Sequence, residues 1–351
     1  MPPSRARGNV TPALAAGKPA LVSSPATVVN PFIGTSNQAD DFPGADVPFG
    51  MVQWSPDTPS RPDGGGYEYK DSSITGFSLT HLAGPGCGAG GDVPVLPTVG
   101  AVNTGATDAF SHSNESASAG SYKVALNNQV TTELTTTTRS GMARFTLPSS
   151  TQANLIFKLP GSQSGASATQ FTRVSSTEVS GQATSGHFCG AGNTYTVYFD
   201  MVFDQPFTAQ GAAAAKTAGT PVAKPAKHLS KNAAETPNKP RLHGKTPPAT
   251  ASKSASAGAV TPDAAASSGY VTFNTTANPV VQAKVGISYV STANAVANRA
   301  AEKPGWNFDA TRSAAQSGWN TLLGRWGSPA APPRSSRAST PRSTTRCCTR
   351  T

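Results

Sequence analysis

The sequence predicts a mainly β fold, an antiparallel β-sandwich followed by a short helical linker. Strand-like runs follow one another without intervening helices through most of the 351 residues, and only the last apolar stretch changes to helical spacing. The chain also holds 34 glycines and 30 prolines, so turns and loops are abundant. This combination is typical of two packed antiparallel sheets.

The predicted strands are runs rich in Val, Thr, Tyr and Phe, the residue types that favour β structure. They cover residues 122–126, 130–138, 142–147, 153–159, 170–174, 178–184, 194–203, 269–274 and 280–290. Residues 194–203 alternate apolar and polar side chains most regularly. We expect the sandwich domain to extend over residues 28–292, after a disordered leader at residues 1–27.

Residues 208–268 interrupt the strands with Ala, Lys, Pro, Thr and Ser and almost no large apolar side chain. Such a segment buries too little surface to offset its ordering entropy, so we expect a disordered insertion between two strands. After the last strand, residues 293–325 show helical spacing and predict a linker toward a following domain. Its second helix is expected from about Asp309, with Asn307 or Asp309 as its cap.

Residues 326–351 contain no acidic residue and an arginine every few positions. One interpretation is a natural disordered basic tail. The other, which we favour, is translation in a shifted reading frame, because back-translation of this segment with ordinary codons allows a neighbouring frame to spell an apolar, helix-like sequence. The nucleotide sequence of this region distinguishes the two.

The formal net charge is +10, but the basic residues concentrate in the leader, the insertion and the tail. The remaining sequence is therefore mildly acidic. Since the basic segments lack interleaved aromatic residues for stacking on bases, nucleic-acid binding is not expected. No apolar run is long enough to span a membrane, and the start of the chain is a weak signal-peptide candidate.

The chain has four cysteines, of which Cys347 and Cys348 lie in the tail and Cys87 and Cys189 in the predicted sandwich. The latter two either form a disulfide in an oxidising compartment or remain buried thiols. Five scattered histidines and the cysteines form no metal-binding spacing.

Residues 30–100 are dense in Gly, Pro, Asp and aromatic residues, a composition typical of functional loops with fixed backbone geometry. The segments VNPFIGT (29–35), FPGADVPFGMVQWSPDT (42–58), GGGYEYKDSSITGFSLTHLAGPGC (64–87) and GDVPVLPTVG (91–100) occur there in order. Further segments are SGHFCGAGNTYTVYFDMVFDQPFTA (185–209), NPVVQAKVGISYVS (278–291) and PGWNFDA (304–310). Together these segments resemble glycoside hydrolase family 92, the calcium-dependent exo-α-mannosidases, over residues 28–207 and 269–325. Ala83 stands where the family usually has Ser.

The resemblance implies a galactose-mutarotase-like β-sandwich (a supersandwich) packed against a C-terminal (α/α)6 barrel. It also implies inverting hydrolysis of α-mannosides in mannose-containing glycans, with a Glu as general acid, an Asp as general base and Ca²⁺ positioning the mannose. The family's carboxylates and most of its calcium contacts lie in the barrel, which is absent from this sequence. No catalytic or metal residue is therefore assigned, and secretion or a periplasmic location follows from the resemblance alone.

The loop block offers candidate substrate-binding residues. Gly65 and Gly66 would let the backbone approach a ligand, and Trp54 and Tyr67 could stack on a pyranose ring, with sandwich core as the alternative for both aromatic residues. His81 and the loop containing Gly86 and Cys87 could bind sugar hydroxyls, with a loop-fixing hydrogen bond as the alternative for His81.

Several other residues are assigned structural roles from their sequence context. Asp57, Asp63, Asp71 and Asp92 are expected to serve turns and caps, His187 is expected to be structural, and His112 is expected to be incidental.

Two functions remain open. The chain is either the sandwich domain of an exo-α-mannosidase, inactive by itself, or a stand-alone carbohydrate-binding module. The first predicts an exposed apolar patch where a barrel would dock, including Trp306, Trp319 and Leu322.

Overall fold

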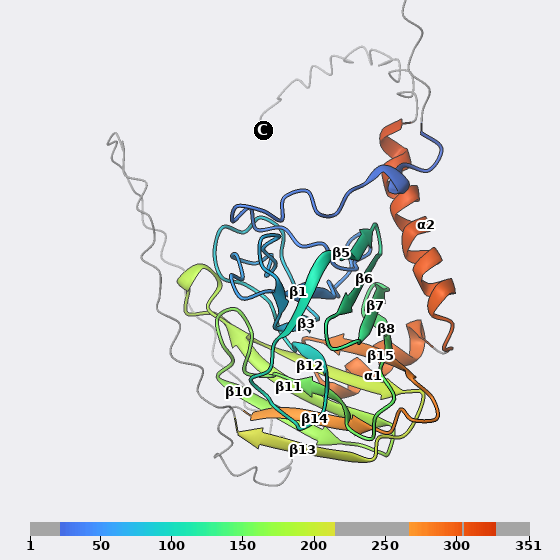
Figure 1. The fold of residues 1–351 in the computed structure, drawn as a ribbon. Helices are drawn as coiled ribbons and strands as arrows, with labels where there is room; N and C mark the ends of the chain where they lie inside the picture. The colour runs from blue at the N-terminus through green and yellow to red at the C-terminus, as the bar shows by residue number, and fades with distance from the viewer. Residues whose placement is uncertain (1–21, 215–266, 304, 328–351) are drawn as a thin grey trace, which may run out of the picture.

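The computed structural model of the chain is a β-sandwich with two α-helices along one flank (Figure 1). It describes residues 22–214, 267–303 and 305–327. Within these residues all paired strands are antiparallel and lie in two sheets, which confirms the predicted mainly β sandwich followed by helices. The tail from residue 328 and the leader up to residue 21 lie outside the described residues, as does the insertion at 215–266.

The larger sheet has nine strands and forms one face of the sandwich. One of its strands has the same bounds as the most regularly alternating strand predicted from the sequence, residues 194–203. In spatial order its strands are β10 (Ala168–Arg173), β11 (Glu178–Gly186), β12 (Thr194–Phe203), β15 (Val280–Ser288), β8 (Ser140–Thr146), β7 (Thr131–Thr136), β6 (Ser121–Leu126), β5 (Asp108–Ser118) and β2 (Ser73–Ile74).

The second sheet has six strands, and its edge strand corrects one boundary of the predicted insertion. Its strands are β1 (Ser55–Asp57), β3 (Gly76–Ser78), β4 (Val95–Val99), β9 (Ala153–Phe157), β14 (Ser267–Phe273) and β13 (Ala209–Ala214). We expected disorder from residue 208, but residues 209–214 pair with β14 as far as Ala214 opposite Ser267. Backbone hydrogen bonding to a buried neighbour strand outweighs the low β propensity of this Ala-rich run.

Aromatic side chains from the two sheets meet in the core. Phe157 of β9 stacks on Phe199 of β12 with ring centroids 5.7 Å apart, and Phe203 of β12 meets Phe273 of β14 edge-on at 5.1 Å. All four rings are essentially buried. Offset and edge-on aromatic contacts add to the free energy gained from burying their apolar surface, so these pairs fix how the sheets stack.

Helix α1 (Thr292–Glu302) covers the outer face of the nine-stranded sheet, mainly over β15 and β12. Ser291 caps it by accepting a hydrogen bond from the Asn294 amide at 3.1 Å. The helix lies so close to β15 that a Cβ at Gly286 would come within 2.3 Å of the Ala295 carbonyl oxygen. A glycine is therefore required at this crossing.

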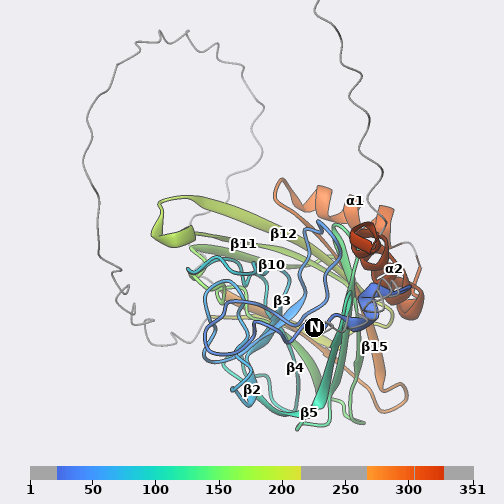
Figure 2. The same cartoon turned by 90° about the horizontal axis from the view of Figure 1, so that it is seen from above.

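Helix α2 (Phe308–Gly327) follows β6, β7 and β8 and then extends past the end of the strands (Figures 1 and 2). Asn307 caps it through the Ala310 amide at 2.9 Å, one of the two predicted caps. The one-turn helix η1 (Pro25–Val28) lies against its far half, where Asn320 accepts from the Ala26 amide at 2.9 Å. None of the described helices is long and apolar enough to cross a membrane.

Candidate functional site

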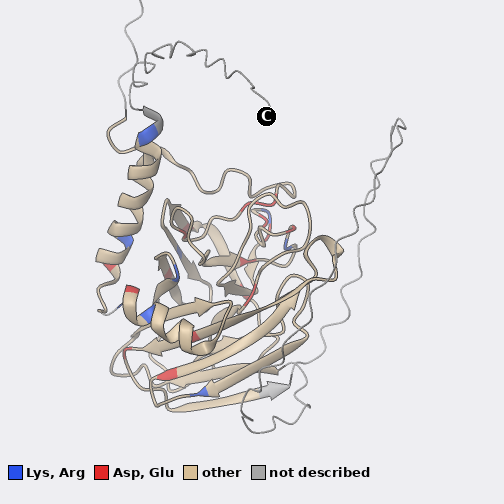
Figure 3. Ribbon diagram, turned by 180° about the vertical axis from the view of Figure 1, so that it is seen from behind, with Lys and Arg blue, Asp and Glu red and all other residues tan. Residues whose placement is uncertain are grey.

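The Gly- and Pro-rich loops from residues 30–94 gather at one end of the sandwich and hold one another by backbone hydrogen bonds (Figures 1 and 3). The Gly84 amide donates to the Asp40 carbonyl at 2.9 Å, and the Gly86 amide donates to the Asp40 carboxylate at 3.0 Å. The Leu82 amide donates to the Gly64 carbonyl at 3.1 Å. We call this region the loop block (residues 30–94); its internal bonds give it a defined surface although its only regular elements are the short strands β1, β2 and β3.

Gly65 and Gly66 are needed for packing within the loop block. A Cβ on Gly65 would lie 2.5 Å from the Asp41 carbonyl oxygen, and one on Gly66 would lie 2.7 Å from a carboxylate oxygen of Asp57. Gly66 also has a φ of +73°, which favours glycine. The close backbone approach predicted from the sequence is therefore made to neighbouring protein atoms, which gives these glycines a structural reason independent of any ligand.

A buried polar cluster underlies the loop block. The His81 ring donates from Nδ1 to the Gln53 carbonyl oxygen at 2.9 Å, and its Nε2 lies 3.3 Å from Asp57 Oδ1. Arg61 approaches the same carboxylate oxygen at 3.4 Å, and Ser78 donates to the other oxygen. Burial opposes ionisation of Asp57, but the Arg61 guanidinium and the His81 ring outweigh it and hold the pKa of this carboxyl below its usual value.

Trp54 and Tyr67 occupy the sandwich core. Both are 0% exposed, so neither ring offers a face to a sugar in this structure. The Trp54 indole donates to the Phe77 carbonyl at 3.2 Å, and the Tyr67 hydroxyl donates to Glu115 at 2.7 Å. The structure therefore favours the core interpretation for both residues. Buried Trp and Tyr side chains need such partners for their polar ends.

A cavity of about 300 Å³ opens beside His81, and three exposed apolar side chains form its rim. Leu82, Phe188 and Tyr289 are 45%, 39% and 44% exposed. The cavity is lined by Met51, Gln53, Thr80, His81, Leu82, Ala89, Gly90, Gly186, Phe188, Tyr195 and Tyr289. Polar groups that fix a ligand's orientation, combined with apolar walls, are typical of small-molecule sites.

The rim residue Phe188 is tied to the loop block by the disulfide between Cys87 and Cys189, which settles the alternative left open by the sequence. Phe188 lies in the one-turn helix η2 (Phe188–Gly190) between β11 and β12. Its neighbours His187 and Cys189 both have left-handed φ values, 56° and 53°. Non-glycine residues adopt this conformation at an energetic cost, so the covalent link maintains an otherwise unfavourable turn.

Sequence reasoning missed Phe188 and Tyr289. They reach the His81 cavity from η2 and from the residue after β15, both more than 100 residues after His81 along the chain. Sequence analysis gave Cys189 only a possible pairing with Cys87 and gave its neighbour Phe188 no role. That pairing was the available signal, because a disulfide to the loop block would bring Phe188 there. Tyr289 carried no comparable signal.

Several polar residues differ from their expected roles. His112 is not incidental: its Nδ1 lies 2.5 Å from Glu115 and its ring stacks on Tyr69 with centroids 4.1 Å apart. Asp92 is completely buried and accepts hydrogen bonds from Thr80 and Tyr195, both at 2.8 Å, so it is a core acceptor and not a turn residue. Of the other three acids, Asp57 is buried like Asp92. Asp71 accepts a hydrogen bond from the Ser60 amide, as a turn residue does, and Asp63 is exposed.

The three side chains expected to form an exposed apolar docking patch are not strongly exposed. Trp306, Trp319 and Leu322 are half-buried, and the Trp319 indole donates to the Asp46 carbonyl at 3.0 Å. Strongly exposed apolar side chains lie instead on the loop block, led by Phe49 at 89% and Ile33 at 72%. The helix covers its own aromatic residues by packing them on the sandwich, and it leaves the loop tips uncovered.

Asp46 lies where α2 meets the loop block, beside a cavity of about 470 Å³ that Trp319 also lines. Burial raises the pKa of Asp46 to about 6, and the nearby Asp41 carboxylate adds to the effect. Because the folded pKa exceeds the unfolded value of 3.8, folding stability is expected to fall as pH rises from about 4 through 6.

We therefore predict that Asp46→Asn raises the free energy of unfolding at pH 7.5 by about 1–3 kcal/mol and changes it little at pH 4. Urea denaturation at both pH values measures this, with Asp63→Asn as an exposed control in the same loop block. An equal gain at both pH values would show that burial of the charge is not the cause.

The sandwich fold is shared with solved carbohydrate-cleaving enzymes. A family 92 α-mannosidase from Bacteroides thetaiotaomicron superposes with a TM-score of 0.67 and 27% identity, over 86% of this chain and 38% of that one. The same enzyme solved with mannoimidazole superposes with a TM-score of 0.67 at 26% sequence identity. A further family 92 glycosyl hydrolase gives a TM-score of 0.64 at 26% identity, over 86% of this chain and 37% of that one. These similarities place the fold in the class of glycoside hydrolase sandwich domains.

The family follows from the sequence itself. Residues 28–288 match the family model described as the glycosyl hydrolase family 92 N-terminal domain, and the chain belongs to that family. An uncharacterized secreted glycosidase of Arthroderma benhamiae is 28% identical over 130 residues, which are 34% of this chain and 17% of that protein. The chain thus spans well under half the length of the relatives that it matches.

The calcium implied by the resemblance has no assigned ligands here. Across residues 22–214, 267–303 and 305–327, no group of three or more His, Cys, Asp or Glu side chains is arranged to hold a metal ion. The function proposed below therefore assigns no metal ligand among these residues.

Proposed function

We propose that this chain forms the carbohydrate-binding wall of a family 92 α-mannosidase active site, with the His81 cavity as its sugar-contacting surface. The observation that carries the proposal is the pair of exposed rings, Phe188 and Tyr289, on the rim of this cavity beside the half-buried Gln53. The His81 ring lies beneath them, with its two nitrogens engaged by Gln53 and Asp57. Aromatic rings pack on the C–H face of a pyranose, while the Gln53 amide is placed to bind a hydroxyl. Membership of family 92 and the mannoimidazole complex of a relative support mannose as the sugar.

Hydrolysis itself is proposed to need groups that this wall does not supply. An inverting glycosidase uses two carboxyl groups about 6.5–9.5 Å apart on opposite sides of the scissile bond. Among the described residues that line the His81 cavity, none is Asp or Glu. The acid and base are therefore assigned to parts of the full-length relatives that this chain does not match.

The stand-alone binding module remains the second candidate, because the cavity is completed by residues of this chain alone. The two functions make different predictions for the gene. A mannosidase requires a following domain that is encoded in the same reading frame as residues 28–325, whereas a stand-alone module does not. Sequencing the gene and assaying its full product on an aryl α-mannoside with Ca²⁺ separates them. Turnover by the full product but not by this chain supports the mannosidase wall, whereas turnover by this chain alone contradicts it.

The disulfide between Cys87 and Cys189 and the similarity to a secreted glycosidase support an extracytoplasmic location. The mannose-containing glycans expected as partners are found there. The location is tested by the oxidation state of the two cysteines in protein trapped with a thiol-alkylating reagent directly from the producing cells.

Phe188→Ala is predicted to weaken binding of methyl α-mannoside to the purified chain by about threefold to tenfold, since an aromatic contact contributes about 0.5–1.5 kcal/mol. Isothermal calorimetry or NMR titration measures the change. The matched control is Phe49→Ala, which removes an exposed phenyl ring outside the His81 cavity. Equal affinities of the two variants would remove Phe188 from the sugar site.

A further inference from the structure

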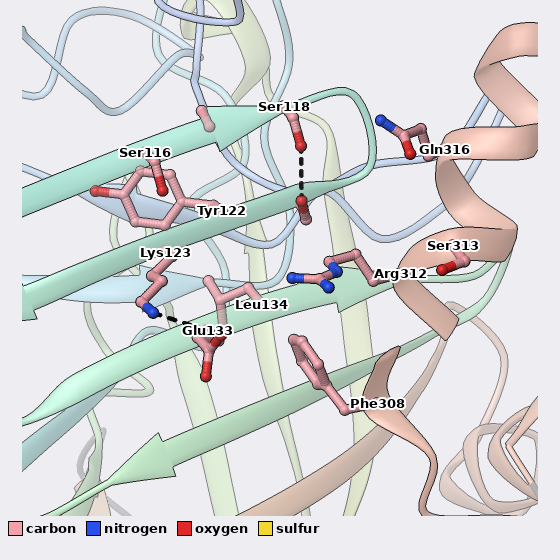
Figure 4. A pocket seen from close by; sticks show the side chains of 12 residues that line it. Ser116, Ser118, Tyr122, Lys123, Glu133, Leu134, Phe308, Arg312, Ser313 and Gln316 are labelled. Atoms are coloured by element: carbon pink, nitrogen blue, oxygen red, sulfur yellow. Dashed lines mark hydrogen bonds and ion pairs between the residues drawn. The ribbon is translucent and has the colours of Figure 1, made fainter. Parts of the chain in front are cut away.

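A second cavity, of about 330 Å³, lies between the outer face of the nine-stranded sheet and the start of α2 (Figure 4). Strands β5, β6 and β7 supply one wall, and the side chains of Phe308, Arg312, Ser313 and Gln316 supply the other. It shares no lining residue with the His81 cavity. Most of its lining is polar, although helices usually pack on sheets through apolar side chains.

Five charged side chains form a continuous chain of ion pairs around this cavity. Lys123 on β6 lies 3.9 Å from Glu133 on β7, which binds Arg144 on β8 through two contacts of 2.7 and 3.0 Å. Arg144 reaches Asp309 of α2 at 3.2 Å, and Asp309 pairs with Arg312 at 3.1 Å. The Arg144 hydrogen bonds hold the pKa of Glu133 below its usual range, so this carboxylate is ionised at neutral pH.

The chain of ion pairs alternates in sign and begins and ends with a cation. Three positive and two negative groups leave an excess of one positive charge. The two terminal cations, Lys123 and Arg312, are also the two basic residues that line the cavity, and both remain about half exposed. An anion placed between them would complete the alternation and form charge-assisted hydrogen bonds with both.

The Glu133 carboxylate and several neutral donors surround these cations. Ser118 and Ser121 share a hydrogen bond of 2.9 Å at one end of the cavity, while Gln316 extends from the facing helix (Figure 4). Phe308 and Leu134 also line the cavity, but they are only 3% and 0% exposed. Hydroxyl and amide groups match the hydroxyls of a sugar.

We propose that this cavity is an ancillary binding site for a sugar that carries an oxyanion, either a phosphate or a carboxylate. Arg312 and Lys123 bind the oxyanion, and the serine hydroxyls with Gln316 bind the sugar hydroxyls. We call it the ion-pair site. It operates independently of the His81 cavity and would let the domain hold an acidic unit of a glycan while another unit is bound elsewhere.

The test is calorimetric or NMR titration of the full chain with glucose 6-phosphate, glucuronate, inorganic phosphate and neutral methyl α-glucoside. We expect both acidic sugars to bind more tightly than either phosphate alone or the neutral sugar, and to lose affinity as salt is raised. Arg312→Gln should weaken the acidic sugars by about tenfold, the loss of one charge-assisted contact. Arg325→Gln, a cation on the same helix outside the cavity, is the control.

Three outcomes would overturn the proposal. These are equal binding of the neutral and acidic sugars, binding of inorganic phosphate as tight as that of glucose 6-phosphate, and identical affinities of the Arg312→Gln and Arg325→Gln variants. Lys123→Gln provides a second variant on the opposite wall and is expected to weaken acidic sugars in the same way. Because Lys123 lies on a strand and is half exposed, its loss leaves the fold intact and keeps the test valid if Arg312→Gln unfolds.

Discussion

Removing the disulfide with Cys87→Ser/Cys189→Ser is expected to lower the free energy of unfolding of this chain by about 3–5 kcal/mol. The link spans 102 residues, and closing a loop of that length restricts the unfolded chain strongly. It also fixes the left-handed turn at His187 and Cys189, and relief of that unfavourable backbone conformation is expected to offset a small part of the loss. Chemical denaturation of the purified variant at pH 7 measures the loss.

The chain offers a matched control for this variant. Cys347→Ser/Cys348→Ser removes the other two cysteines, which lie outside the described residues. It is expected to leave the unfolding midpoint unchanged, whereas wild-type protein reduced with a dithiol should behave like Cys87→Ser/Cys189→Ser. A loss below 1 kcal/mol in the disulfide variant would mean that the loop block and η2 hold their positions without the covalent link.

Asp57→Ala is expected to lower the free energy of unfolding by about 3–5 kcal/mol. The substitution leaves Arg61 and the fully buried His81 ring facing a site without a carboxylate. The variant also deprives Ser78 of its acceptor. The comparison is Asp63→Ala, which is exposed in the same loop block and should change stability by no more than about 0.5 kcal/mol.

The pH dependence of the Asp57→Ala effect gives a second readout. The pKa of Asp57 is lower in the folded state than its usual 3.8, so its stabilising contribution is present above that pH and is lost as pH falls through the folded value. The difference between wild type and Asp57→Ala should therefore shrink in acid. A constant difference from pH 7 to pH 3 would indicate lost packing and not lost ion pairing.

Most of the sheet core could be predicted from the sequence because its strands carry β-branched and aromatic residues. Strand β12 shows this most clearly, since its observed bounds, Thr194–Phe203, equal the predicted ones. Strand β5 was missed because DAFSHSNESAS is polar, with Phe110 as its one large apolar side chain, so its sequence shows no apolar–polar alternation. Strand β13 was assigned to disorder for a related reason, since AQGAAA owes its strand conformation to pairing with β14.

The candidate site could be predicted only in part. The composition of residues 30–94 pointed to the loop block, and His81 does line a cavity there. The sequence could not distinguish a glycine that approaches a ligand from one that approaches another loop, which is the case for Gly65 and Gly66. It also could not show that Trp54 turns into the core while Phe188, from a distant hairpin, turns outward at the rim. Such assignments depend on tertiary placement, which local composition does not encode.

The central claim is that the His81 cavity of this chain is the surface that contacts mannose. The most direct measurement is an NMR titration of the isotopically labelled chain with methyl α-mannoside, with backbone and side-chain resonances assigned. We predict saturable shifts at His81, Phe188 and Tyr289, and none at β13 on the opposite edge of the smaller sheet. Saturable shifts confined to another face of the sandwich, or no shifts at millimolar sugar, would contradict the claim.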